Sequence, residues 1–182
     1  MDRRDKELDY SNMEAIPTYA LYGENENSGE SWLHWETITS RSRLHGFRIS
    51  PHRHDQLYQI LYLRGGAATV MLDGDTFEIS PPAIVIVPPL TVHSFVFSEG
   101  VDGFVLTFYI QDVRNGLADI ETAMDGLMRP CILKPVAGVV ETDEIEHAVE
   151  RLIAEADRSA PGQVAALRAR LSLLLVAAHR LD

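Results

Sequence analysis

The sequence has almost no cysteine, no long apolar run and no excess of basic residues. Its single cysteine, Cys131, cannot form an internal disulfide, which suits a reducing compartment. The longest apolar runs, Ala83 to Leu90 and Leu171 to Ala178, are far shorter than the roughly 20 residues that a membrane-spanning helix needs. No apolar segment of a secretory signal follows the charged N-terminus. We therefore expect a cytoplasmic protein that does not enter a membrane.

The charge balance excludes one class of function for this chain alone. Lysine and arginine number 16, aspartate and glutamate number 27, and the formal net charge is −11. A chain this acidic repels the phosphates of a nucleic acid. Any contact with DNA is therefore expected from a region outside these 182 residues, a length that suits one domain with a modest appendage.

Short alternating or β-branched runs, broken by Gly, Pro, Asp and Asn, extend from Ile16 to Ile110. This pattern is typical of an antiparallel all-β unit. The clearest turn is Asp73-Gly74, because glycine readily takes the positive φ of a tight hairpin. About nine strands are predicted, at residues 18–22, 33–39, 45–49, 57–64, 67–72, 76–79, 83–87, 93–97 and 103–110.

The periodicity becomes helical after Ile110, and this change divides the chain. We expect a flexible tail at 1–14, a β-barrel at 15–111, a short helix and connection at 112–140, and a helical hairpin at 141–182.

Thr142 is the predicted N-cap of the first hairpin helix, and the acidic residues after it suit the positive end of the helix dipole. The second helix is expected from about Pro161. Its segment Leu171 to Ala178 is almost continuously apolar, which is more than one face of a surface helix needs. The first helix and the β unit can cover this segment. Alternatively, the same helix of a second subunit covers it, and we expect a homodimer formed through the hairpin.

Five of the seven histidines lie between His34 and His93. Residues two apart on a strand share a face, so His52 and His54 can point together into a barrel. His93 would supply a third nitrogen ligand and Gln59 an oxygen, a set compatible with a divalent transition metal. The alternative is that the three histidines are hydrogen-bonded pocket or core residues that bind no metal.

A group of residues with fixed spacing resembles the first motif of the cupin superfamily: Gly46, His52, His54, Gln59 and Gly66. The segment from Pro88 to His93 resembles the second motif. The resemblance implies a mainly β fold, a double-stranded β-helix barrel of the jelly-roll type, followed here by a C-terminal αα-hairpin. Two positions depart from the motifs. Gln59 replaces the glutamate of metal-dependent cupins with a weaker, neutral ligand, and Leu90 stands where the second motif usually has glycine.

Further segments resemble the N-terminal effector-binding domain of AraC-type transcriptional regulators, in the branch that senses hydroxybenzoate or hydroxyphenylacetate. These segments are 16–24, 51–54, 57–63, 72–74, 87–95, 102–107 and the terminal helix pair. The resemblance covers the chain from Ile16 to Asp182. It implies dimerisation through the helices after the barrel, and DNA binding by a C-terminal pair of helix-turn-helix units that is absent from this chain.

Strand periodicity also predicts the wall of a barrel cavity. Counting by twos places Phe95 and Phe97 on the face of His93, and Leu61 and Leu63 on the face of Gln59. Such a wall is apolar and aromatic and suits a ring. The candidate ligand-binding residues are His52, His54, Gln59, Leu61, His93, Phe95 and Arg48.

Arg48 is the candidate cation for a ligand carboxylate, because it has the strand parity of His52. A bulge at Pro51 would reverse this parity and turn Phe47 and Ile49 inward instead. Tyr58 and Tyr62 are expected to pack outside the barrel.

The resemblance implies a non-enzymatic sensor domain that binds a small aromatic acid and requires no cofactor. The alternative is a stand-alone metal-dependent cupin enzyme such as a dioxygenase, in which His52, His54, Gln59 and His93 hold zinc, nickel or iron. Gln59 weakens this alternative, since non-haem iron oxygenases use a carboxylate ligand. A purely structural dimerisation module would leave the clustered histidines without a role.

Overall fold

The computed structural model of the chain describes residues 16–19, 33–118 and 125–182. The tail expected at 1–14 and most of the strand expected at 18–22 lie outside these ranges. In the described ranges, every helix lacks the length or the apolar character needed to cross a lipid bilayer.

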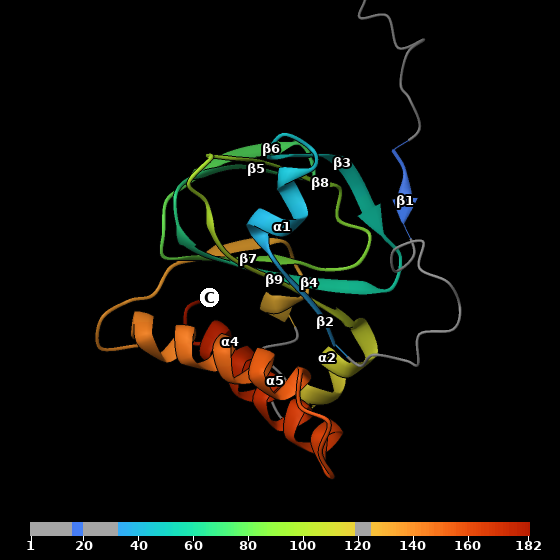
Figure 1. The fold of residues 1–182 in the computed structure, drawn as a ribbon, viewed down its shortest axis with the longest axis vertical. Helices are drawn as coiled ribbons and strands as arrows, with labels where there is room; N and C mark the ends of the chain where they lie inside the picture. The colour runs from blue at the N-terminus through green and yellow to red at the C-terminus, as the bar shows by residue number, and fades with distance from the viewer. Residues whose placement is uncertain (1–15, 20–32, 119–124) are drawn as a thin grey trace, which may run out of the picture.

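Two five-stranded sheets form the β unit (Figure 1). The first sheet contains, in order, β1 (Thr18–Tyr19), β3 (Arg48–His54), β8 (His93–Phe97), β5 (Ala68–Leu72) and β6 (Asp75–Ile79). The second contains β10 (Cys131–Leu133), β7 (Ala83–Val87), β4 (Leu57–Gly65), β9 (Asp102–Tyr109) and β2 (Leu33–Thr37). Strand neighbours are antiparallel, except that β1 pairs with β3 in parallel. This is the mainly β jelly-roll of the cupin type that the sequence predicts.

The hairpin between β5 and β6 has a two-residue turn. Leu72 pairs with Asp75, and the intervening Asp73 and Gly74 have φ angles of 49° and 99°. Two consecutive positive φ angles match the twist of the flanking strands, so the predicted turn is confirmed.

Strand β4 belongs to two cores at once. Leu61 and Leu63 lie in the core between the sheets, whereas Tyr58 and Tyr62 lie in a second core between the second sheet and the helices. Burial on both faces explains why this strand is mostly apolar rather than alternating from Leu57 to Leu63, where Gln59 is the one residue with an amide side chain. The prediction that the two tyrosines pack outside the barrel is confirmed, and the Tyr58 hydroxyl donates to the carbonyl of Leu127 at 2.8 Å.

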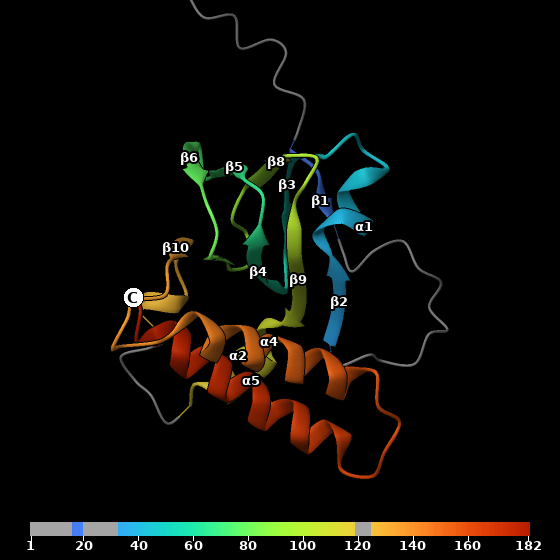
Figure 2. The same ribbon diagram turned by 60° about the vertical axis from the view of Figure 1, so that its left-hand side comes forward.

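The helices cover the outer face of the second sheet (Figure 2). They are α2 (Ile110–Gly116), α4 (Thr142–Ala156) and α5 (Gln163–His179). The N-cap of α4 is Glu141 rather than Thr142, and α5 begins after Gly162, whose φ of 82° is not helical. The Gln163 amide donates to two carbonyls at the end of α4, at 2.9 and 3.0 Å, and so joins the helices.

Several predicted boundaries are wrong. The strand predicted at 33–39 ends at Thr37, because the Thr37 side chain accepts a hydrogen bond from the Ser40 amide and starts helix α1 (Ile38–Arg43). The strand predicted at 45–49 begins only at Arg48. The segment predicted as a short helix and connection at 112–140 contains most of helix α2, which begins at Ile110, and strand β10, which was not predicted; its residues 119–124 lie outside the described ranges.

Candidate functional site

Three histidines meet inside the barrel. His52 and His54 lie on β3, and His93 lies on β8 directly opposite His52. The ring centroid of His52 is 4.2 Å from that of His93 and 5.0 Å from that of His54. All three side chains are buried. The predicted convergence of the imidazoles is therefore confirmed.

Backbone carbonyls set the tautomers of two rings. Nδ1 of His52 is 2.8 Å from the carbonyl oxygen of Ser50, and Nδ1 of His93 is 2.9 Å from that of Thr91. A carbonyl oxygen only accepts, so Nδ1 carries the proton and Nε2 of each neutral ring keeps a lone pair. Burial, helped by neighbouring positive charge, lowers the pKa of His52 to about 4 and that of His93 to about 3. Both rings are neutral at pH 7.

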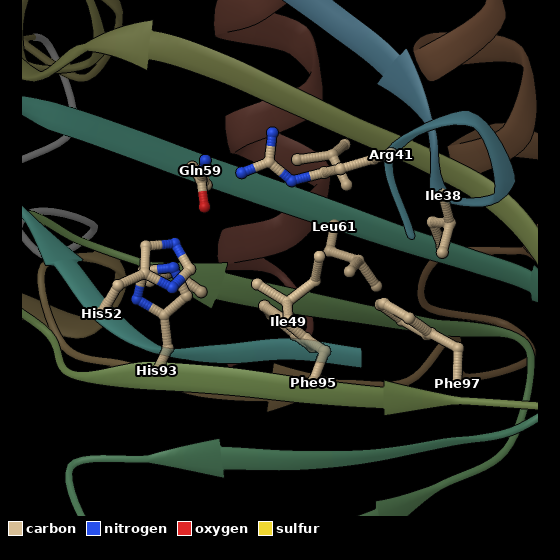
Figure 3. Close-up of a pocket in the computed structure, with 11 residues that line it drawn as sticks. Ile38, Arg41, Ile49, His52, Gln59, Leu61, His93, Phe95 and Phe97 are labelled. Atoms are coloured by element: carbon tan, nitrogen blue, oxygen red, sulfur yellow. The ribbon is translucent and has the colours of Figure 1, made fainter. Parts of the chain in front are cut away.

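This donor set can hold a divalent metal. One nitrogen from each histidine lies within 4.8 Å of the others. Nitrogens bound to one zinc ion lie at most about 4.2 Å apart, since each bond is about 2.1 Å long, so small ring rotations suffice. Nε2 of His93 makes no hydrogen bond to any described residue. The Gln59 amide donates to Thr107 Oγ1 at 3.3 Å, and its oxygen faces the histidines (Figure 3).

A small cavity lies beside the histidines. Its volume is about 10 Å³, which is close to the minimum for one water molecule. Five of the seven predicted ligand-binding residues line it: His52, Gln59, Leu61, His93 and Phe95. The ring centroids of Phe95 and Phe97 are 5.5 Å apart and the ring planes make an angle of 7°, so the two rings stack and form an aromatic wall.

The structure does not bring Arg48 to this cavity. Its side chain is exposed, because the β3–β8 pairing shifts register between Ile49 and His52. One extra residue on a strand reverses which side chains face inward. The prediction that Arg48 contacts the ligand, which was based on its strand parity with His52, is therefore wrong. Ile49 lines the cavity instead, as expected if a bulge lies at Pro51.

Arg41 is the cation among the described residues that line the cavity, and it is not one of the ligand-binding residues predicted from the sequence. It lies on α1, a helix that was not predicted, so no periodicity pointed its side chain inward. Its Nη1 is 2.7 Å from Glu36 Oε2, and its side chain is 14% exposed. Burial lowers the pKa of Arg41 to about 10, which leaves the guanidinium charged at neutral pH.

The backbone conformation at Leu90 shows why the second cupin motif usually has glycine at this position. Its φ is 68°, a left-handed conformation that favours glycine. Its amide donates to the carbonyl of His54 at 2.7 Å, so this turn fixes the end of β3.

The fold is a cupin-type β-barrel with a small cavity between its two sheets. Residues 34–175 match the model of the AraC-like ligand binding domain, and the chain belongs to this family. No curated protein matches the chain.

Solved structures resemble the chain only distantly. Apo ToxT from Vibrio cholerae has 12% identity and a TM-score of 0.49, covering 77% of this chain and 52% of its own. The AraC-like transcriptional activator CuxR has 11% identity and a TM-score of 0.42, covering 67% and 43%. KdgF from Halomonas sp. has 31% identity and a TM-score of 0.32, covering 34% and 56%. The chain thus spans about half the length of each.

The buried histidines predict a stability that depends on pH. Their pKa values in the folded state lie below the value of about 6.5 expected in the unfolded chain, so acid protonates the unfolded chain first. The melting temperature of metal-free protein should fall as the pH drops from 7 toward 4. His93→Gln should reduce this fall, whereas His147→Gln at an exposed position should not. Equal pH profiles for the wild type and His93→Gln would contradict the assignment.

Proposed function

We propose that this domain binds a small aromatic acid in the barrel cavity and is the effector-sensing part of an AraC-type transcriptional regulator. The observation that carries the proposal is the composition of the cavity. It has a buried guanidinium at Arg41, an aromatic wall at Phe95 and Phe97, and imidazole lone pairs at His52 and His93. Such a site suits a ring that bears an acid group and a hydroxyl group.

The ligand must enlarge the cavity, because about 10 Å³ cannot contain a ring. Ile49, Phe95 and Phe97 occupy the space between Arg41 and the barrel wall, and Ile49 is only half-buried (Figure 3). Movement of Ile49 toward solvent and new rotamers of the two phenylalanines would open this space. Ligand binding is then coupled to a change in the barrel wall.

The hydroxybenzoate- or hydroxyphenylacetate-responsive branch supplies the first ligands to test. DNA binding would belong to a C-terminal pair of helix-turn-helix units outside this chain, which agrees with the net charge of −11. The division into a tail at 1–14, a barrel at 15–111, a connection at 112–140 and a dimerising hairpin at 141–182 belongs to the same proposal.

The hairpin is placed to receive a signal from the barrel. Trp35 Nε1 on β2 donates to Asp157 Oδ1 after α4 at 3.0 Å. Arg64 on β4 binds Asp102 at 2.7 Å and Glu146 of α4 at 3.2 Å. A change in the sheet would therefore alter contacts with α4 directly.

Calorimetric titration tests the ligand. We expect para-hydroxybenzoate or para-hydroxyphenylacetate to bind the wild-type domain and to raise its melting temperature. His93→Ala should weaken binding about two- to tenfold, because a buried hydrogen bond contributes ~0.5–1.5 kcal/mol. His147→Ala is the matched control at an exposed histidine and should bind normally. Absence of binding across this panel would refute the aromatic-acid proposal.

A second candidate function follows from the histidine cluster, which can hold zinc, nickel or iron with Gln59. Zinc titration should show one site in the wild type and a loss of at least about tenfold in affinity for His52→Ala, as expected when one ligand of several is lost. His147→Ala should retain the site. Stoichiometric iron together with oxygen uptake would favour a metal-dependent cupin enzyme over the sensor, and absence of metal binding would remove this candidate.

We also propose that α5 forms the dimer. Leu173 is 67% exposed although it lies in the almost continuously apolar segment 171–178 of α5. Leu173→Glu should shift the protein toward the monomer in sedimentation velocity, because a buried unpaired carboxylate is costly at an interface. Leu44→Glu, at an exposed position outside the hairpin, should not. A wild-type monomer at micromolar concentration would contradict this assignment.

A further inference from the structure

We propose that Arg41 recognises the carboxylate of the ligand, and that this carboxylate replaces Glu36 at the guanidinium. The inference rests on the proposed function, namely that the cavity binds an organic acid. It adds the residue that selects the acid group and a competition within the domain that sets the affinity.

Position is the first argument. Arg41 extends from α1 over Leu61 toward Gln59, above the two phenylalanines (Figure 3). Among the described residues that line the cavity, Arg41 is the one arginine or lysine, and none is an aspartate or a glutamate. The guanidinium of Arg41 is therefore the group that would compensate the charge of an acid bound in the cavity.

The neighbouring arginines do not offer the same contact. The side chains at 43, 48 and 53 are exposed. A contact in water contributes little, because an exposed ion pair is worth about 0–1 kcal/mol. Only at Arg41 does low exposure strengthen a charge-assisted hydrogen bond.

The present partner of Arg41 is suited to exchange. Glu36 contacts the guanidinium through Oε2 to Nη1, and its side chain is 28% exposed, so its carboxylate can turn toward water. His34 Nε2 already lies 3.6 Å from the same oxygen. Arginine binds a carboxylate best through two parallel hydrogen bonds, and a ligand carboxylate inside the cavity can approach in that way. No net charge is then left unpaired in the cavity.

The exchange would also reach the helical hairpin. Glu36 is next to Trp35 on β2, and Trp35 contacts Asp157 beside α4. Adjacent residues of a strand face opposite sides. The ion pair that the ligand would replace therefore lies on one face of β2, next in sequence to the residue that contacts the hairpin from the other face.

The test compares an acid with its neutral isostere. Titrations of para-hydroxybenzoate and para-hydroxybenzamide are measured with the wild type, Arg41→Gln, Glu36→Gln and Arg43→Gln. Arg41→Gln should lose about ten- to a hundredfold in affinity for the acid, as expected for a hydrogen bond to a charged group, and should bind the acid and the amide alike. Glu36→Gln should bind the acid more tightly than the wild type, because the competing carboxylate is gone. Arg43→Gln, an exposed arginine of the same helix, should match the wild type.

The outcomes separate this inference from the proposed function. If the wild type binds neither compound nor para-hydroxyphenylacetate, the proposed function fails, and the inference fails with it. If the wild type and Arg41→Gln bind the acid equally and prefer it equally over the amide, the inference is overturned while the proposed function stands. If Arg41→Gln does not fold, Glu36→Gln decides, since unchanged or weaker binding of the acid by that variant overturns the exchange.

Discussion

The pairing of β3 with β8 is the constraint on which the site depends. It places His52 opposite His93, and its register shift turns Ile49 inward and leaves Arg48 in solvent. Within each strand segment, the backbone carbonyl two residues before the histidine accepts from Nδ1, so that the two rings present lone pairs on Nε2. A regular ladder would have put a different set of side chains in the barrel.

The cavity combines a guanidinium, two imidazoles and an amide with an apolar, partly aromatic wall. A charged guanidinium enters from α1, while neutral imidazoles stand on β3 and β8. Burial holds the histidines neutral, but it cannot neutralise arginine, whose pKa stays far above the physiological range. An anionic or hydroxylated guest matches this asymmetry, and a metal matches the histidine end alone.

The second sheet links this site to the helices. Its central strands β7, β4 and β9 are largely buried, by the barrel core on one side and by the helices on the other. Close-packed interiors transmit displacement rather than absorb it. Ion pairs of Arg64 and the hydrogen bond of Trp35 add specific contacts at the rim of that packing. The architecture is suited to a domain whose ligand and output surfaces lie on opposite sides of one sheet.

Local pattern determined much of this protein. Period-two runs identified most strands, the Asp73-Gly74 turn followed from its chemistry, and the spacing of His52 and His54 placed both on one face, because these features depend on residues close in sequence or on one repeating face. The cupin resemblance added His93, which the pairing of β8 with β3 brings to them. Tertiary structure alone decided the rest. The bulge that excludes Arg48 depends on how β8 pairs with β3, and Arg41 is buried only because the short helix α1 packs over the barrel and Glu36 of β2 compensates its charge. The residues near Arg48 and Arg41 in the sequence predict neither the β3–β8 pairing nor the burial of Arg41, since both depend on contacts with distant parts of the chain.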